Sequence, residues 1–448
     1  MTIQVNSIEG KAVKKVIPLA SIIKSQFSST LFKSAGIYTG SRIVNAAIPF
    51  LMMPVLTRFL TPTDYGIVAM FSVLVGIATP FVGLSLHGAV SVKYFDRNET
   101  DLPRYIGNCF LVLAATMIVV SFFFWLFADP ISKYSAFPKQ WLWAVVFVAA
   151  AQFIGTLLLT IWQVQDKPFK YGVFQNALTL LNLGLTMIFV VGMNKNWQGR
   201  IEAQVLTFAW FALMAVFFLS RGNWLKISYD RKSINHALGF GLPLIPHSLG
   251  GLLIMQTDRI FLANMVGVAA AGIYVVGYQF GSIIELLASS FNQAYAPWLF
   301  RQLSDEDPTV KPRIVKLTYL YFIGILVLAL LLSLLVPFFL SFFVGKNFLD
   351  ARHYVFWITL GFAFNGMYYM VANYIFFAGK TAVLAWVTFV SAMMNIAFNY
   401  VLIKLNGSVG AAQASALTFL VTFLMTWALS ARVYKMPWKL KDADVRNY

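Results

Sequence analysis

Residues 315–344 read VKLTYLYFIGILVLALLLSLLVPFFLSFFV, thirty residues in which a single side chain, that of Lys316, carries a charge. A helix needs about 20 mostly apolar residues to cross the hydrocarbon core of a bilayer, which is about 30 Å thick. This stretch is therefore long and apolar enough to span a membrane. Because the bilayer core offers no hydrogen-bond partners to exposed backbone, the span must be a helix.

The composition of the whole chain agrees with that first span. Of the 448 residues, 59% are hydrophobic, 16% are aromatic and only 11% are charged. Soluble domains are about 25% charged, and charged side chains seldom bury unless they are paired. A water-soluble globular fold is thereby excluded. The single cysteine, Cys109, also excludes an intramolecular disulfide.

Eleven further apolar segments of comparable length predict an all-α integral membrane protein with about twelve transmembrane helices. Short polar interruptions such as Thr61-Pro62-Thr63-Asp64 and Asn194-Lys195-Asn196 separate them. The predicted spans lie near 35–60, 66–93, 105–129, 141–164, 171–193, 202–220, 239–265, 272–297, 315–344, 353–378, 382–404 and 410–431.

The basic residues predict how these spans are oriented. With an even number of spans, both termini lie on one side, which carries 24 of the 34 Lys and Arg residues. The opposite side carries 8, and Arg42 and Arg259 lie inside spans. Because basic residues concentrate in cytoplasmic loops, both termini are expected in the cytoplasm. The net charge of +17 is thus mostly a topology signal, and no nucleic-acid partner is expected.

The polar stretch 221–238 divides the chain into two halves of six spans. We expect a basic cytoplasmic segment at 1–33, a six-helix lobe at 34–220, an inter-lobe linker at 221–238, a second lobe at 239–431 and a cytoplasmic tail at 432–448. The halves echo each other weakly: TRFLTPTDYGIVAMF at 57–71 and DRIFLANMVGVAAAGIYVV at 258–276 each enter a helix led by glycine, Gly66 or Gly272. Parallel repeats of this kind are related by a pseudo-twofold axis along the membrane normal, and substrate binds between them.

Two hairpins resemble a known family. They are SAGIYTGSRIVNAAIPFLMMPVLTRFLTPTDYG (34–66) and FGLPLIPHSLGGLLIMQTDRIFLANMVGVAAAGIYVVGYQFG (240–281), and both are similar to the polysaccharide (O-antigen) flippases of the Wzx type. That family shares a superfamily with MATE multidrug exporters and lipid II flippases. The resemblance implies two six-helix bundles in a V that opens alternately to each side of the bacterial inner membrane.

The same resemblance implies the cargo. It would be an undecaprenyl-pyrophosphate-linked oligosaccharide, moved from the cytoplasmic to the periplasmic leaflet for the synthesis of O-antigen lipopolysaccharide or a similar polysaccharide. Besides this cargo and membrane lipid, a polysaccharide polymerase and glycosyltransferases are the candidate partners. No cofactor or metal is expected, and H⁺ or Na⁺ is the candidate coupling ion.

Charged and polar residues inside the predicted spans are candidates for the site. Charge is costly at this depth, so a residue of this kind is a functional candidate by default. Arg42 and Asn45 share one face of span 35–60, where a guanidinium suits a pyrophosphate because it binds phosphate oxygens bidentately. The alternative for Arg42 is snorkelling to the cytoplasmic interface or pairing with another helix.

Span 239–265 offers a second set. Arg259 follows Gln256 by three residues, on the same face, and could receive the phosphate of the cargo or form a salt bridge that closes the lobes. Its neighbour Asp258 points about 100° away, so the two side chains are not expected to pair. His247 lies among Pro243, Pro246 and two glycines, where it either faces the cavity or packs between helices.

Glu285 lies near the middle of span 272–297, on a face that also carries Ser282, Ser289 and Asn292. Glu285 and Asp258 are the candidates for ion coupling. The alternative for Glu285 is a structural acid that is permanently protonated or paired with arginine.

Two other functions compete with a flippase. A MATE-like, ion-coupled exporter of small cationic compounds would need an acidic cavity, whereas Arg42 and Arg259 are basic. A membrane polymerase or glycosyltransferase would need large outer loops or a catalytic domain with clustered acids. The sequence has no such loop, and its clustered acids, Asp305, Glu306 and Asp307, lie in a predicted cytoplasmic turn. We therefore expect a transporter that is not an enzyme and has no catalytic residue.

Overall fold

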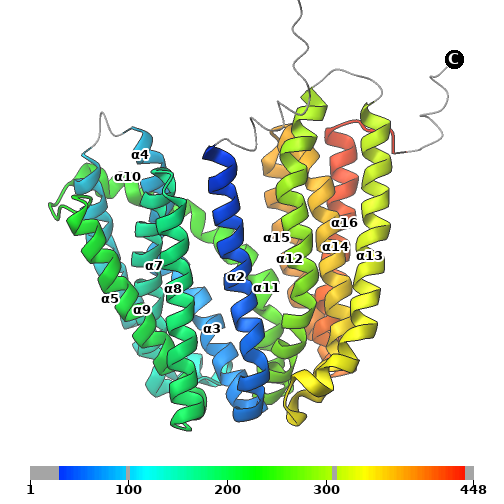
Figure 1. Cartoon of the computed structure of the whole chain (residues 1–448), viewed down its shortest axis with the longest axis horizontal. Coiled ribbons are helices and arrows are strands. Elements are labelled where there is room, and N and C mark those ends of the chain that lie inside the picture. Colours follow the sequence, from blue (N-terminus) through cyan, green and yellow to red (C-terminus); the bar gives the residue numbers. More distant parts are fainter. Residues whose placement is uncertain (1–29, 97–100, 305–309, 439–448) are drawn as a thin grey trace, which may run out of the picture.

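The computed structural model describes residues 30–96, 101–304 and 310–438, and within these ranges the chain forms helices and no strand. The side chains of several residues in the first helix, and that of His247, lie outside the described part. Figure 1 shows two groups of near-parallel helices that diverge toward one end of the molecule.

The described part of the first half is made of α-helices joined by short turns. Short 3₁₀ and π segments, η1 (Lys139–Trp141) and η2 (Met187–Gly192), extend two of them. The helices are α2 (Thr30–Phe59), α3 (Pro62–Gly83), α4 (Leu86–Phe95), α5 (Leu102–Leu126), α6 (Ala128–Ser135), α7 (Leu142–Val164), α8 (Pro168–Thr186) and α9 (Asn196–Arg221).

The second half repeats this arrangement after a short connecting helix. The helices are α10 (Arg231–Gly241), α11 (Ile245–Met265), α12 (Val268–Ser304), α13 (Val310–Phe343), α14 (Arg352–Phe377), α15 (Thr381–Asn406) and α16 (Val409–Val433). The 3₁₀ turns η3 (Leu242–Leu244) and η4 (Lys346–Ala351) precede α11 and α14.

Each of the twelve predicted spans is occupied by a helix, so the all-α membrane fold is confirmed. Among the described residues, ten helices are long and apolar enough to cross a membrane. An eleventh is added if α10 and α11, which meet at a bend of 41°, are taken as one span. The first predicted span is α2, whose described apolar part is Phe50–Phe59.

Two predicted segments differ in detail from the structure. The span 66–93 is broken between α3 and α4, where Leu84 and Ser85 both have positive φ. The predicted linker 221–238 is only partly a loop, because α10 begins at Arg231 and contacts α4 and α5. The loop before α10 is bonded to the buried side chain of Asn108 on α5. This amide donates to Ser228 O at 2.8 Å and accepts from Asp230 N at 2.9 Å.

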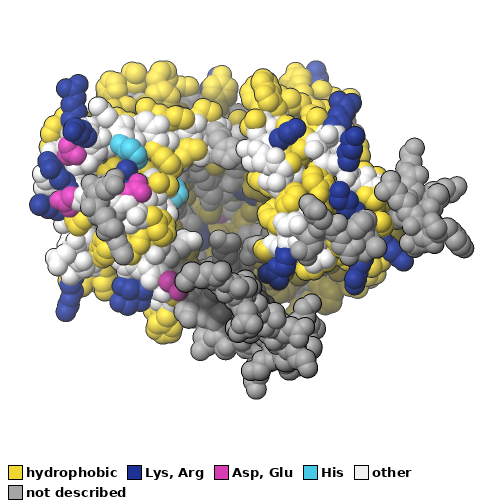
Figure 2. All heavy atoms as spheres, turned by 90° about the horizontal axis from the view of Figure 1, so that it is seen from above, with side chains coloured by type: hydrophobic (Ala, Val, Ile, Leu, Met, Phe, Trp, Pro, Cys, Tyr) yellow, Lys and Arg dark blue, Asp and Glu magenta, His cyan; other side chains and the backbone are white. Residues whose placement is uncertain are grey.

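The two lobes, α2–α9 and α11–α16, meet at one end of the molecule and separate at the other (Figure 1). We call the end where α2 finishes and α12 begins the closed end, and the end where α2 begins and α16 finishes the open end. Figure 2 looks onto the open end and shows a hollow between the lobes, with Lys and Arg side chains on both.

Two glycines make the closed end tight. A Cβ atom on Gly66 of α3 would lie 2.0 Å from the carbonyl oxygen of Val268, the first residue of α12. A Cβ on Gly272 of α12 would lie 2.0 Å from the carbonyl oxygen of Pro62, the first residue of α3. Each glycine is the fifth residue of its helix, so the contact is symmetric between the lobes. This reciprocity agrees with the pseudo-twofold relation that the sequence echo indicates.

Polar contacts add to the closed end. Thr57 Oγ1 on α2 accepts a hydrogen bond from the Gly345 backbone N–H at 3.0 Å, and Arg58 donates to the Phe342 carbonyl oxygen at 3.0 Å. These bonds join α2 of the first lobe to the end of α13 in the second. The closed end is thus fixed by backbone contact and by side-chain bonds together.

Candidate functional site

A cavity of about 340 Å³ lies between the lobes, above the closed end. Both lobes contribute to its walls: α2, α3, α8 and α9 from the first, and α11 and α12 from the second. Its polar lining residues are Tyr65, Ser72, Thr179, Asn182, Arg200, Gln204, Arg259, Tyr278, Gln279 and Ser282. The site is therefore an inter-lobe pocket with an apolar side formed mainly by α2.

Arg259 brings a guanidinium from α11 into this cavity. The group donates to the side-chain carbonyl of Gln256, one turn earlier, and lies over the Tyr278 ring at 4.8 Å from the centroid. Arginine over an aromatic ring is stabilised by the electron-rich face of its π-system. The Nε atom of Arg259 is buried without a hydrogen-bond partner in the described structure. An acceptor in the cavity would satisfy that donor.

Arg200 brings a second guanidinium, from the opposite lobe. It lies in the second turn of α9 and donates to Thr186 Oγ1 at 2.7 Å and to the side-chain oxygen of Asn182, both on α8. Arg200 is one of the 8 Lys and Arg residues that the sequence count assigns to the loops opposite the termini, and this placement is wrong because Arg200 lies within α9. The available signal was spacing, since Arg200 and Gln204 share one face of α9 and both line the cavity.

The cavity is electrostatically one-sided. Its lining includes two arginines and no Asp or Glu. In the ranges that the structure describes, four ion pairs occur, and neither Arg200 nor Arg259 takes part in any of them. Two guanidinium groups with no carboxylate beside them in the lining are chemically suited to an anion.

Asp258, next to Arg259, points into the second lobe rather than into the cavity. Its side chain is 2% exposed and accepts from the Tyr274 hydroxyl of α12 and, at 3.4 Å, from Ser415 of α16. Only the backbone N–H of Arg259 reaches it, at 2.8 Å. The expected divergence of the two side chains is what the structure shows, and Asp258 ties three helices together.

Glu285 lies one turn beyond the cavity residue Ser282 on α12. Its two oxygens accept from the Tyr369 hydroxyl at 2.6 Å and from the Asn365 amide at 2.8 Å, both on α14. Within the described residues, Glu285 forms no ion pair with an arginine. The alternative that it is a structural acid paired with arginine is therefore not supported.

The remaining candidates are distributed as follows. Asn45 bonds to α8 through Asn176 at 3.3 Å and through Thr179, so it joins α2 to its neighbour and lies outside the cavity lining. The side chains of Arg42 on α2 and His247 on α11 lie outside the described residues. The structure thus brings Arg259, with Gln256 behind it, to the cavity and adds Arg200.

A family model for polysaccharide biosynthesis proteins matches residues 31–303, which is more than half of the chain. The chain belongs to the polysaccharide biosynthesis protein family. The matched range includes both hairpins on which the resemblance rests and all the arginines discussed above.

Relatives of this family member occur in Haemophilus influenzae. One, described as an uncharacterized membrane protein, is 25% identical over 370 residues, which cover 82% of this chain and 88% of the relative. A second, described as Lsg locus putative protein 1, is 24% identical over 377 residues. The match covers 82% of this chain and 90% of that relative. Together with the apolar helices, these matches identify a multi-pass membrane protein.

Solved structures show which fold this family member has. An inward-facing multidrug resistance MATE family transporter of the MOP superfamily superposes with a TM-score of 0.63 at 13% identity, over 91% of this chain and 99% of that one. The lipid II flippase MurJ, in an inward closed conformation, gives 0.58 at 14% identity, over 89% and 87%. The chain therefore has the two-lobed fold of these transporters.

Proposed function

We propose that the protein is a flippase for a lipid-linked saccharide, with an undecaprenyl-pyrophosphate-linked oligosaccharide as its cargo. The observation that carries this proposal is the pair of arginines, one from each lobe, that face one cavity lined by no acid. Family membership supports the saccharide part of the cargo. The transporter fold supports movement across the membrane.

The chemistry of the cargo explains why such a cavity is useful. A pyrophosphate and a glycan cannot enter hydrocarbon without losing their hydration, whereas the apolar polyprenyl chain can remain in the hydrocarbon core of the bilayer. Guanidinium groups replace the hydration of phosphate oxygens with bidentate hydrogen bonds. Gln204, Gln279 and Ser282 offer neutral partners beside them. The protein lowers the barrier by solvation, and no bond is made or broken.

The position of the arginines on opposite lobes supports alternating access. In the empty cavity the two cations repel each other, while an anion between them attracts both lobes. Binding of the headgroup therefore favours closure of the hollow over the cargo. Release at the other side requires the closed end to separate. In this proposal the open end faces the cytoplasm of a bacterial inner membrane, as the distribution of basic residues predicts.

Ion coupling is a further part of the proposal. Glu285 lies one turn from the cavity residue Ser282 and is bonded to α14, so a change in its protonation would alter the contact between α12 and α14. We assign H⁺ coupling to Glu285. The burial and bonding of Asp258 support a structural role for that acid instead.

The rival function, export of a cationic compound, is favoured by the MATE-like fold alone. A cationic cargo would meet the two arginines without a compensating acid in the lining. The anionic glycolipid therefore agrees with both the fold and the electrostatics of the cavity.

Proteoliposomes test the proposal. They would contain a fluorescent undecaprenyl-pyrophosphate-linked oligosaccharide in one set and a cationic dye in the other, with transfer read by a membrane-impermeant quencher. We expect transfer of the glycolipid, with at least tenfold slower rates for Arg200→Gln and Arg259→Gln, and no movement of the dye. Dye transport without glycolipid transfer would overturn the assignment.

A matched control separates the site from general charge loss. Arg352 is exposed at the start of α14 and lines neither the cavity nor the closed-end contacts. Arg352→Gln removes the same charge and should transfer glycolipid at the wild-type rate. For ion coupling, Glu285→Gln should keep transfer but abolish its acceleration by a pH gradient.

A further inference from the structure

A second cavity lies on the first lobe, between α8 and α9, near the open end. Its volume is about 730 Å³, larger than that of the inter-lobe cavity. Helices α7, α8 and α9 supply most of its lining, together with the turn that follows α9. The two cavities have no lining residue in common, so this one is separate from the proposed transport site.

Three cations surround the end of this second cavity that is nearer the open end. They are Lys167 and Lys170 at the start of α8 and Arg221 at the end of α9. All three are exposed, and in the described ranges none of them pairs with a carboxylate. The helix α8 also begins here without a side-chain cap, so its positive N-terminal end adds to the field.

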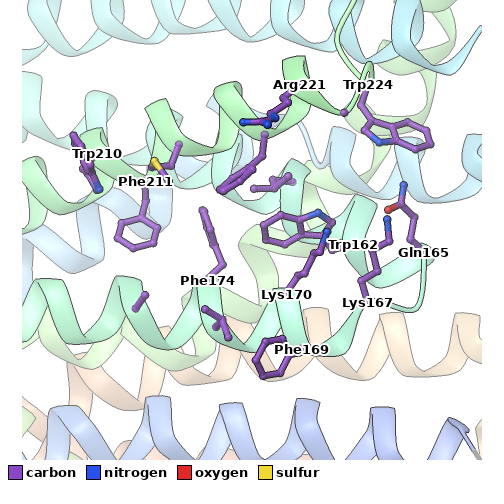
Figure 3. A pocket seen from close by; sticks show the side chains of 16 residues that line it. Trp162, Gln165, Lys167, Phe169, Lys170, Phe174, Trp210, Phe211, Arg221 and Trp224 are labelled. Atoms are coloured by element: carbon purple, nitrogen blue, oxygen red, sulfur yellow. The ribbon is translucent and has the colours of Figure 1, made fainter.

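The rest of the cavity is apolar and runs down between the helices. In Figure 3, Trp210, Phe211 and Phe174 lie toward one end, and Lys167, Gln165 and Trp224 lie toward the other. Trp210 is three helical turns below Arg221, which is roughly 16 Å along α9. Trp210 is 56% exposed and Phe169 is 71% exposed, so the slot is open on the outer surface of the lobe.

We propose that this slot binds an anionic glycerophospholipid of the leaflet at the open end. The phosphate and the anionic headgroup would contact Lys167, Lys170 and Arg221, and one acyl chain would lie along the aromatic slot. Basic pockets between transmembrane helices, at the level of the headgroups, are suited to such lipids. Trp162 also lines this cavity, and tryptophan is a residue type that is typical of the membrane interface.

The slot combines a cluster of cations with an apolar channel. An anionic phospholipid can contact both of them at once, and a soluble anion cannot. A soluble phosphate would use the cations but make no contact with the apolar walls. A neutral lipid would use the walls but leave the cations unneutralised. The helices that form the slot, α8 and α9, also carry Asn182 and Arg200 of the transport cavity, so a bound lipid would brace the elements that position Arg200.

Native mass spectrometry of the delipidated full-length protein tests the proposal. Phosphatidylglycerol and phosphatidylethanolamine with identical acyl chains would be titrated separately, and undecaprenyl phosphate would form a third arm. We expect one tightly bound phosphatidylglycerol, with an affinity about tenfold above that of phosphatidylethanolamine. The variant Lys167→Ala/Lys170→Ala/Arg221→Ala should lose this preference.

Two further variants make the result specific. Ala177→Trp fills the slot while all three cations remain, and it should also abolish the tight site. The control Arg231→Ala/Lys232→Ala/Arg301→Ala removes three exposed cations outside both cavities and should bind like the wild type. Equal binding of the two phospholipids, or unchanged binding by the two slot variants, would overturn the proposal. So would preferential binding of undecaprenyl phosphate at this slot, which would assign it to the carrier.

Discussion

The closed end and the inter-lobe cavity are both contacts between the two lobes, and they are built from opposite materials. At the closed end, Gly66 and Gly272 let backbone meet backbone with no side chain between them. In the neighbouring cavity, Arg200 and Arg259 line a polar space between the lobes. The first contact is reciprocal and made by backbone, and the second is lined by cations and polar side chains.

This difference indicates that the glycine contact and the pair of arginines have separate roles. A glycine contact is specific to one arrangement of the lobes, because any rotation separates the helices. A pair of cations responds to what lies between them, since an anion changes repulsion into attraction. In the proposed transport cycle, the closed end defines one state, and anion binding in the cavity determines when that state is left.

The largest effect is expected from breaking the glycine contact. Gly272→Val places side-chain atoms where a Cβ alone would already lie 2.0 Å from the Pro62 oxygen, so the closed end cannot form. We expect at least a fiftyfold loss of glycolipid transfer and a longer distance between spin labels on the two sides of the closed end. Gly324→Ala, where a Cβ meets nothing within 4 Å, is the control. Normal transfer by Gly272→Val would show that the glycine contact is dispensable.

A smaller effect is expected at the hydrogen bond that joins α2 to the turn after α13. Thr57→Val keeps the shape of the buried side chain but leaves the Gly345 N–H without its acceptor at 3.0 Å. An unsatisfied buried donor costs about 1–3 kcal/mol. Thermal or denaturant unfolding should report a loss of that size. Stability equal to that of the wild type would mean that this bond contributes little to the closed end.

On the cavity side, the support of Arg200 offers a milder perturbation. Asn182→Leu removes one of its two partners on α8 and leaves Thr186 in place. We expect about a fivefold weaker binding of a pyrophosphate-linked saccharide, since a hydrogen bond to a charged group is worth about 1.5–3 kcal/mol and Thr186 retains part of the positioning. A loss as large as that of Arg200→Gln would instead make Asn182 a ligand for the cargo.

The smallest effect is expected at a contact that belongs to neither region. Lys226 lies 3.8 Å from Asp101, and the two side chains are 66% and 50% exposed. Exposed ion pairs of this kind contribute about 0–1 kcal/mol. Lys226→Ala should therefore change neither stability by more than about 0.5 kcal/mol nor transfer. A marked loss of transfer would reveal that the linker before α10 takes part in the movement of the lobes.

The helical spans and the matching positions of Gly66 and Gly272 in the two halves were accessible from the sequence, whereas the reciprocal contact of the two glycines was not. Hydropathy marks each span because the bilayer demands a continuous apolar stretch. The two glycines stand at the same place in their halves, and the structure gives that repetition a steric reason. Helical spacing alone puts Arg259 on the same face as Gln256, one turn before it, and the two side chains are hydrogen-bonded in the structure.

Arg200 and the break at Leu84 were not accessible in the same way. Arg200 follows the polar turn Asn194-Lys195-Asn196, where a basic residue looks like an interface charge. Only the packing of α9 against α8, which provides Asn182 and Thr186, turns its side chain inward. The break lies at Leu84 and Ser85, which both have positive φ. Glycine is the residue that usually adopts this conformation, so the residue types at these two positions do not mark the break in the sequence.

The central claim, that Arg200 and Arg259 together bind the anionic head of the cargo, is tested most directly by binding to the detergent-solubilised protein. The ligand would be a short-chain polyprenyl-pyrophosphate-linked oligosaccharide, and the control ligand would be the same oligosaccharide on an uncharged alkyl chain. We predict that Arg200→Gln and Arg259→Gln each weaken binding of the charged ligand at least tenfold and leave the uncharged ligand unaffected. Equal affinity of the wild type and the double variant for the pyrophosphate ligand would contradict the account.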